Sequence, residues 1–321
     1  MDVISFGLIG LGRHGSRYAR HLMADVPGAR LVAVCRRNRE GGEAFARNHG
    51  LTFYAEPQAL LADPRVEAVA IVVPPALHRD LCLAAIGHRL PFVVEKPMAP
   101  SLAEAQEILG AAEQAGVRGT VAHTLRFDSV VRSLKAEIPH FGGIDVLTIR
   151  QRMEGFSRTW IDDPDSGGIL RHIGVHALDL IRFLREEEVS SLYCEITRIS
   201  SIHTEDCFAA VLRLHGDGAV ALVNAVGGTS GREGRIEVIG DGGLLVADYT
   251  RGSLKRRKGT RSITLPVSPA VPTVRECLAA FVAWLAGGPA PPVSLQDGLR
   301  AVELVDACHR SAATHTLVRL G

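Results

Sequence analysis

Nine consecutive residues near the N-terminus carry glycines at the spacing of a phosphate-binding turn. The stretch reads Gly7-Leu8-Ile9-Gly10-Leu11-Gly12-Arg13-His14-Gly15, with GxGxxG at Gly10, Gly12 and Gly15. A buried-strand pattern precedes it and an amphipathic helical pattern follows it, which is the context that gives this motif meaning. The glycines would allow a tight turn, the approach of a pyrophosphate and close helix packing, and the helix N-terminus would offer N–H groups to phosphate. We therefore predict a dinucleotide site at residues 10–15.

The end of the second strand-like run indicates which dinucleotide fits. An NAD site carries Asp or Glu there, which accepts hydrogen bonds from the ribose. This chain reads Val34-Cys35-Arg36-Arg37-Asn38. A guanidinium cannot accept such a bond, but it binds a 2′-phosphate through a bidentate fork. Arg36 could instead stack on the adenine. Because no acid is present to repel a 2′-phosphate, Arg36 and Arg37 favour NADP(H) over NAD(H).

Two further groups place titratable side chains at defined points of the predicted elements. Lys96, in Glu95-Lys96-Pro97, follows a strand-like run and precedes a proline, which favours extended backbone at the strand end. His172 and His176 lie four residues apart on a helical pattern and so share one face. An imidazole with a pKa near ~6.5 can donate or accept a proton. A metal on this pair is formally possible, but no third ligand is evident and we predict none.

The elements that would position these residues indicate two domains. Up to about residue 121, short apolar runs alternate with amphipathic stretches, as in βαβ units around a parallel sheet. Ser101 and Glu104 read as a capping box. Beyond residue 121, runs in which apolar and polar residues alternate are joined by hairpin signals at Gly216-Asp217-Gly218 and at residues 240–243. The predicted fold is α/β: a doubly wound Rossmann domain over 1–121, then an α+β domain with a mostly antiparallel sheet over 122–321, for substrate binding and oligomerisation.

Further segments resemble the glucose–fructose oxidoreductase/inositol dehydrogenase/MocA family over nearly the whole chain. They are, in order, residues 70–78 (AIVVPPALH), 95–97 (EKP), 167–168 (GG) leading to 174–179 (GVHALD), 297–303 (DGLRAVE) and 311–313 (SAA). The resemblance implies that Lys96 orients the substrate hydroxyl and helps its proton move, and that His176 is the general acid/base. It also implies that Pro74, His78, Glu95 and Lys96 lie on the cofactor side. Asp179, one helical turn after His176, could orient that ring or bind solvent.

One position departs from the family pattern. His172 stands where many members carry an aspartate, so a carboxylate that would pair with Lys96 is replaced by an imidazole. With His123, Arg126 and Arg171 nearby in the motif order, the predicted pocket becomes more basic. Trp160 could form a stacking wall for a sugar-like ring, or belong to the core. His123, Arg126, Trp160 and His172 are the predicted substrate contacts.

Composition excludes several classes of partner. A net charge of +1 indicates neither nucleic acid nor an anionic membrane surface. The longest apolar run is too short to span a bilayer, no signal peptide is evident, and six scattered cysteines fit reduced thiols in the cytoplasm. The run Lys255-Arg256-Arg257-Lys258 is interpreted as a solvated hairpin tip. Alternating apolar residues such as Val211 and Leu222 predict a homodimer or homotetramer formed through the second domain's sheet.

The sequence therefore predicts NADP(H)-dependent oxidation or reduction of a sugar, cyclitol or related hydroxy/oxo compound. Three versions of the second site stay open: a reductase in which both histidines supply protons, a pocket for an anionic substrate, or a non-catalytic dinucleotide-dependent sensor. Glycosidic-bond cleavage through transient oxidation by bound NAD is a further possibility within the family.

Overall fold

The computed structural model describes residues 3–154, 160–164, 167–216 and 218–321, and backbone contacts divide the chain into two compact units. Unit 1 comprises Met1–Thr124 and Pro272–Leu299; unit 2 comprises Leu125–Val271 and Arg300–Gly321. Helix α9 (Leu295–Thr314) continues across the division. The expected single boundary at 121/122 thus omits a late segment that belongs to unit 1.

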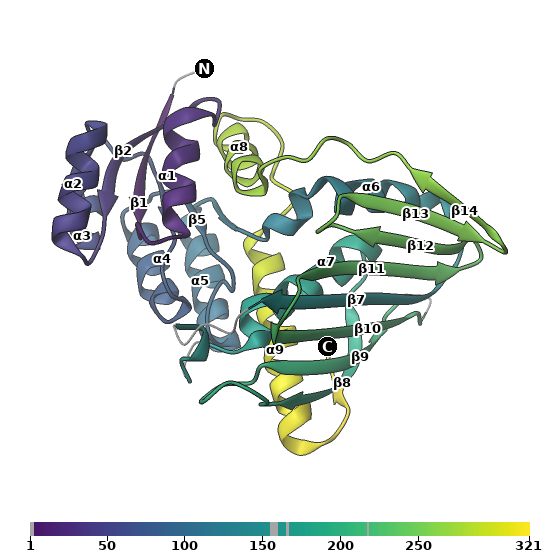
Figure 1. Ribbon diagram of the computed structural model, residues 1–321. Helices are drawn as coiled ribbons and strands as arrows, with labels where there is room; N and C mark the ends of the chain where they lie inside the picture. Colours follow the sequence, from purple (N-terminus) through teal and green to yellow (C-terminus); the bar gives the residue numbers. More distant parts are fainter. Residues whose placement is uncertain (1–2, 155–159, 165–166, 217) are drawn as a thin grey trace. The chain divides into compact units, whose positions relative to one another are not determined.

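Unit 1 is built on a parallel sheet in the order β3-β2-β1-β4-β5-β6 (Figure 1). All its side chains in β4 and β5 are buried, as parallel strands covered on both faces require. The strand order reverses between β1 and β4, and ligands of open parallel sheets bind at the carboxyl ends beside such a reversal. The strands are β1 (Ile4–Ile9), β2 (Ala29–Cys35), β3 (Thr52–Tyr54), β4 (Ala68–Ile71), β5 (Phe92–Val94) and β6 (Gly119–Val121).

The helices of unit 1 begin where the sequence supplies caps. The side chain of Asn38 accepts a hydrogen bond from the Gly41 N–H at 3.1 Å, at the start of α2. Ser101 and Glu104 form the expected capping box of α5. The helices are α1 (Gly15–Ala24), α2 (Arg39–His49), α3 (Pro57–Leu61), α4 (His78–Gly87), α5 (Leu102–Ala115) and α8 (Thr273–Leu285), with 3₁₀ turns η1 (Pro75–Leu77) and, at the division, η2 (Thr124–Phe127).

Specific contacts hold the returning segment Pro272–Leu299 in unit 1. The ring of Phe281 on α8 meets Phe6 of β1 edge to face, with centroids 6.3 Å apart. The hydroxyl of Thr120 on β6 donates a hydrogen bond to the Val293 carbonyl at 2.6 Å. Helical periodicity indicates an apolar face but not the sheet that this face covers, which is why the sequence alone placed α8 in the wrong unit.

Unit 2 is built on a sheet in the order β14-β13-β12-β11-β7-β10-β9-β8-β15. Neighbouring strands are antiparallel except β7 and β10, which run parallel. This confirms the predicted mostly antiparallel sheet. The strands are β7 (Ile144–Glu154), β8 (Val189–Thr197), β9 (Cys207–Leu214), β10 (Val220–Thr229), β11 (Glu233–Gly240), β12 (Gly243–Asp248), β13 (Ser253–Lys258), β14 (Arg261–Leu265) and β15 (Val318–Arg319).

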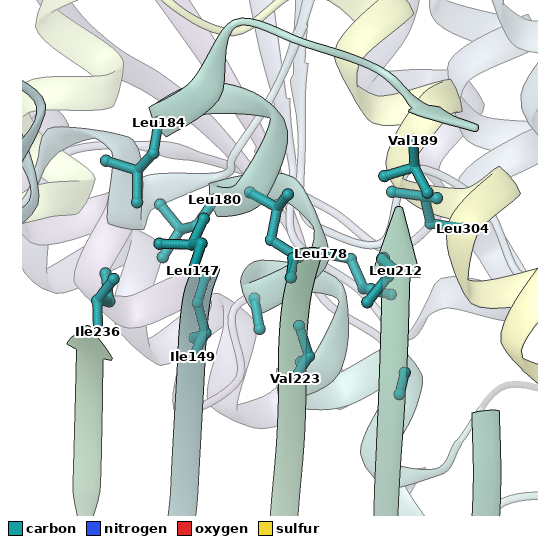
Figure 2. Close-up of a cluster of buried hydrophobic side chains, with 14 of the residues drawn as sticks. Leu147, Ile149, Leu178, Leu180, Leu184, Val189, Leu212, Val223, Ile236 and Leu304 are labelled. Carbon is teal, nitrogen blue, oxygen red and sulfur yellow. The ribbon is translucent and has the colours of Figure 1, made fainter. Parts of the chain in front are cut away.

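One face of this sheet forms the core of unit 2. Leu147 and Ile149 of β7 lie beneath Leu178 and Leu180 of the helix above, and all four are fully buried (Figure 2). Apolar burial of this kind is the main force that holds such a layer together. The remaining elements of unit 2 are α6 (Ser129–Glu137), η3 (Ile138–His140), η4 (Trp160–Asp162), η5 (Leu170–Gly174) and α7 (Val175–Arg185).

One local prediction was correct only in part. The basic run Lys255–Lys258 is mostly exposed and belongs to a hairpin, but it lies within strand β13, paired with β12 and β14, and residues 259–260 form the tip. Arg256 packs over the ring of Phe141, 5.5 Å from its centroid. Charged residues beside an edge strand such as β14 discourage pairing with other chains, which gives this run a structural role. Within the described residues, every helix is too short or too polar to cross a membrane.

Candidate active site

The glycine turn after β1 has the geometry that a bound pyrophosphate needs. Gly10 adopts φ +100°, and a Cβ there would lie 2.0 Å from the Val72 carbonyl oxygen. A Cβ on Gly15 would lie 1.9 Å from the Gly10 carbonyl oxygen. Nothing lies within 4 Å of a Cβ built on Gly12, three residues before α1 begins at Gly15. Open space at a helix N-terminus, with its N–H groups and dipole, suits an anion, so the turn fits a dinucleotide.

The guanidinium of Arg36 lies at the end of β2, against the first turn of α2. A Cβ on Gly41 would be 3.0 Å from Arg36 Nη1. Among the described residues, neither Arg36 nor Arg37 makes an ion pair or a side-chain hydrogen bond, and Arg37 is exposed. Two uncompensated cations beside a helix N-terminus form a site for negative charge.

A buried carboxylate joins the glycine turn to the end of β5. Oε1 of Glu95 accepts hydrogen bonds from His14 Nε2, at 2.6 Å, and from the Tyr18 hydroxyl. Oε2 accepts a bond from the backbone N–H of Lys96 at 3.1 Å. Burial raises the pKa of Glu95, but His14, Lys96 and Tyr18 together lower it to about 2. Glu95 is therefore an anion at neutral pH.

Lys96 has the proton affinity of a group that can exchange protons near neutrality. Burial lowers the pKa of its ammonium to about 8, while the Glu95 carboxylate acts in the opposite direction. A basic group whose pKa lies near the working pH can both hold and release a proton during a reaction. Lys96 lies in a bend two residues after β5 ends at Val94, and the Lys96–Pro97 peptide bond is cis.

His78, expected on the cofactor side, has both ring nitrogens next to backbone carbonyl oxygens. Its Nδ1 lies 2.8 Å from the Pro97 carbonyl oxygen and its Nε2 lies 2.9 Å from that of Val73. The ring is fully buried, and burial lowers its pKa. His78 therefore connects the loop after β4 to the loop after β5, whereas Pro74 is exposed in the first of these loops.

In unit 2, His172 and His176 lie at the start of a helix that begins with a π turn. Residues Leu170–Gly174 form this turn, and α7 continues from Val175. Both histidines are partly buried. Single π turns occur frequently at functional sites, because the wider turn redirects side chains. The predicted helical stretch is confirmed, but its first turn is not α-helical.

Glu205 holds the start of this helix. Its Oε1 accepts a hydrogen bond from the Leu170 N–H at 3.1 Å, and its backbone carbonyl accepts one from Ile169 at 2.9 Å. The carboxylate also lies over Gly168, where φ is +98° and a Cβ would meet it at 2.2 Å. A carboxylate at a helix N-terminus is stabilising, and the lack of a side chain at Gly168 leaves room for it.

Arg126 and Asp179 are not placed as the sequence suggested. Arg126 Nη2 lies 2.6 Å from Asp179 Oδ1, and Nε lies 2.9 Å from Oδ2, with side chains 5% and 2% exposed. The guanidinium also lies over Phe183, 5.1 Å from the ring centroid. The charge of Arg126 is compensated within unit 2, so Arg126 does not make a substrate pocket more basic, and Asp179 is engaged by Arg126.

The remaining predicted residues divide between the units. Lys96 and the fully buried His123 lie in unit 1, while Arg171, His172 and His176 lie in unit 2. The side chain of Trp160 lies outside the described part of the chain. Sequence reasoning missed Tyr18 and Glu205. Tyr18 lies four residues after His14 on the same helix face, a spacing that could have indicated it.

Comparisons with known proteins agree with this architecture. Residues 4–123 match the oxidoreductase family with NAD-binding Rossmann fold named GFO_IDH_MocA, and residues 141–246 match the GFO/IDH/MocA C-terminal domain. D-apiose dehydrogenase of Paraburkholderia graminis is 28% identical, over 98% of this chain and 88% of that protein. Myo-inositol 2-dehydrogenase of Thermotoga maritima is 26% identical, over 98% of both chains.

A solved structure shares the fold. Aldose-aldose oxidoreductase from Caulobacter crescentus superimposes with a TM-score of 0.89, at 20% identity, over 99% of each chain. The two family matches together cover more than half of the sequence. The first spans the strands of the parallel sheet, and the second spans strands of the mostly antiparallel sheet. This chain is a member of the Gfo/Idh/MocA family of oxidoreductases.

Proposed function

We propose that this enzyme transfers a hydride between NADP(H) and a sugar, cyclitol or related hydroxy/oxo compound. The observation that carries the proposal is Lys96, whose pKa lies at about 8, at the carboxyl end of β5 in a sheet whose glycine turn fits a dinucleotide. Relatives named for apiose and myo-inositol support a polyhydroxylated substrate.

The residues of this chain would handle the proton. Oxidation of an alcohol removes a hydride from carbon and a proton from oxygen, and reduction of a carbonyl adds both. The bound nicotinamide would accept or supply the hydride. Lys96 would orient the reacting oxygen and share its proton, and His176 would act as general acid/base with His172 beside it.

The preference for NADP(H) is supported by Arg36 and Arg37. Both lack a carboxylate partner among the described residues, and Arg36 lies against the first turn of α2. A 2′-phosphate would gain charge-assisted hydrogen bonds there that a ribose hydroxyl cannot match.

We further propose an anionic or carbonyl substrate and reaction in the reductive direction. The support is His172, which puts an imidazole, a group that can donate a hydrogen bond or a proton, where many members of the family carry an aspartate. Such groups complement an oxygen that becomes alkoxide-like during reduction. His172→Asp should weaken binding of carboxylated ligands and leave the dissociation constant of NADPH nearly unchanged. Equal affinity of both proteins for these ligands would refute the anionic substrate.

The test of the proposed activity is single-turnover oxidation of NADPH. Sugars, cyclitols and oxo acids are first screened for thermal shifts with NADPH present, and confirmed ligands are then mixed with excess enzyme. We expect nicotinamide absorbance to decay with a confirmed ligand. Binding without decay in either direction, for every confirmed ligand, would refute the enzyme and support a dinucleotide-dependent sensor.

The open face of the unit 2 sheet supports self-association. Val211 and Leu222 pair in register on β9 and β10 and are 48% and 38% exposed, and Ile239 of β11 is 41% exposed. Exposed apolar residues on a regular surface are typical of an interface between identical chains. We propose a homodimer or homotetramer through this face. Light scattering that gives the monomer mass of 34.4 kDa at micromolar concentration would contradict it.

A further inference from the structure

The loop between β8 and β9 is held by two buried aspartates and leads directly into Glu205. Asp206 accepts hydrogen bonds from three consecutive backbone N–H groups, those of residues 199–201. Asp162 accepts hydrogen bonds from the next three, those of residues 202–204. Opening the loop would leave two buried carboxylates without these donors, which costs free energy for each of them. The backbone that carries Glu205 is therefore fixed in place.

Glu205 binds the turn that carries His172 with both its backbone and its side chain. Its carbonyl oxygen accepts the N–H of Ile169 at 2.9 Å, and its Oε1 accepts that of Leu170 at 3.1 Å. The N–H of His172 donates to the carbonyl oxygen of Gly168, the residue over which the Glu205 carboxylate lies. The first N–H groups of a helix have no partner inside the helix, so Glu205 supplies from another loop what the turn lacks.

The same strand supports the end of the π turn. A Cβ on Gly174, where the turn ends, would lie 2.7 Å from a ring carbon of Phe208, which is the second residue of β9 and is buried. Nε2 of His309 on α9 lies 3.6 Å from Oε1 of Glu205, and the Glu205 side chain is only 11% exposed. Residues 205–208 thus contact the turn at its beginning and at its end.

We propose that Glu205 is a positioning residue for the two histidines: by binding the first N–H groups of the π turn, it fixes the place from which His172 and His176 act. A single π turn is a rare conformation, and here contacts from outside the helix hold it. A general acid or base works only within hydrogen-bond reach of the proton that it moves, so a displaced turn would slow proton transfer. The inference rests on the proposed function in that it gives both histidines a proton to move.

The placement of the two histidines can be measured without substrate or nucleotide. Diethyl pyrocarbonate labels neutral imidazoles that it can reach from solvent, and mass spectrometry of the intact protein's peptides quantifies the labelling of each of the 13 histidines. His172 and His176 report on the π turn. His78 and His123 are fully buried and report on any general loosening of the chain.

Glu205→Ala removes the side-chain acceptor at the start of the turn. His172 and His176 should then be labelled roughly fivefold faster than in the parent protein, the factor to which loss of a typical N-cap hydrogen bond corresponds. The labelling rates of His78 and His123 should not change, because the loss is confined to one turn.

Two further variants separate the acceptor from other effects. Glu205→Gln keeps a side-chain oxygen that can accept the N–H of Leu170, so it should return the labelling of both histidines to near the parent rate. The matched control is Glu195→Ala. It removes a carboxylate of β8 that accepts hydrogen bonds from Tyr193 and His315 and none from the π turn, and it should leave both rates unchanged.

Single-turnover kinetics with a confirmed ligand then distinguishes a positioning residue from a cap that only stabilises the fold. At saturating ligand, Glu205→Ala should slow hydride transfer by roughly tenfold or more, because small misplacements of reacting groups cost up to about 10²-fold. Glu205→Gln should restore the rate. The dissociation constant of NADPH, whose proposed site lies in unit 1, should be the same in all variants.

Four outcomes would overturn the inference. They are unchanged labelling of the two histidines in Glu205→Ala, an equal rise in Glu205→Gln, an equal rise at His78 and His123, and faster labelling with an unchanged single-turnover rate. A parent protein that turns over no confirmed ligand would refute the proposed function instead, and the labelling alone would then decide whether Glu205 places the histidines. Should Glu205→Ala fail to fold, Glu205→Asp draws the carboxylate back by one methylene and should also speed their labelling; an unchanged rate there would equally overturn the inference.

Discussion

The two units each bury a carboxylate near a proposed catalytic residue, but they treat its charge differently. In unit 1, Glu95 is bound by His14, by the neutral Tyr18 hydroxyl and by a backbone N–H, and its charge still acts on Lys96. In unit 2, Asp179 follows His176 by one helical turn, yet both its oxygens accept bonds from the guanidinium of Arg126. The charge of Glu95 raises the pKa of Lys96. The charge of Asp179 is paired with the guanidinium of Arg126.

The difference shows that the type and burial of a residue do not determine its role. A buried carboxylate paired with a guanidinium is expensive to disrupt, because the partner is left as an uncompensated charge. A buried carboxylate that is not closed in a bidentate pair with a guanidinium keeps its field and can shift the pKa of a neighbour. Glu95 should therefore matter most for proton transfer and Asp179 most for stability, which leads to four predictions in order of expected size.

The largest effect is expected on stability. Asp179→Ala leaves Arg126 buried without its partner and should lower the free energy of unfolding by about 3–5 kcal/mol. Urea unfolding of the variant and the parent measures this loss. The control is the double variant Arg126→Met with Asp179→Leu, which removes both charges and should recover part of the loss. A cost in Asp179→Ala below about 1 kcal/mol would contradict a closed pair.

The next effect is expected on the chemical step. Lys96→Ala and His176→Ala should each slow single-turnover hydride transfer by on the order of 10²-fold or more, because general acid/base groups contribute that much. Neither residue takes part in the Arg126–Asp179 pair, so unfolding midpoints should change far less than in Asp179→Ala. Unchanged rates in both variants, with a confirmed ligand, would remove the proton-transfer role from these residues.

A smaller effect is expected on cofactor choice. The parent protein should bind NADPH at least about tenfold more tightly than NADH, since a hydrogen bond to a charged group contributes about 1.5–3 kcal/mol. Arg36→Asp should reverse this order, because a carboxylate repels the 2′-phosphate and accepts bonds from ribose hydroxyls. Isothermal titration with both nucleotides measures it. Equal or tighter binding of NADH by the parent would leave Arg36 with only the stacking role.

Local sequence signals predicted the features of this molecule that depend on neighbouring residues. The glycine turn and the capping box at Ser101 both depend on residues a few positions apart. The strands β3 and β6 have three residues each, too few to show a period, so the sequence did not indicate them individually. The basic run of β13 was placed at the hairpin tip because its charges dominate a short strand.

The site was less predictable, because its interactions join distant residues. Glu95 and Lys96 could be placed at a strand end, but their links to His14 and Tyr18 span 81 and 77 residues. Arg126 and Asp179 lie 53 residues apart, so the motif order suggested a free cation where the fold forms a pair. The π turn before α7 leaves no periodic signature in so few residues.

The smallest predicted effect concerns pH, and it tests the comparison directly. Lys96 has its pKa lowered to about 8, so its ammonium is the main form below that pH. If the ammonium supplies the proton for carbonyl reduction, single-turnover reduction should be constant below pH 8 and fall above it. Glu95 raises the pKa of Lys96, so Glu95→Gln, which removes the charge and keeps the shape, should move this midpoint below 8 by roughly half a pH unit or more. A midpoint that rises in Glu95→Gln would mean that the carboxylate does not act on Lys96 through its charge, and the contrast between Glu95 and Asp179 would then be lost.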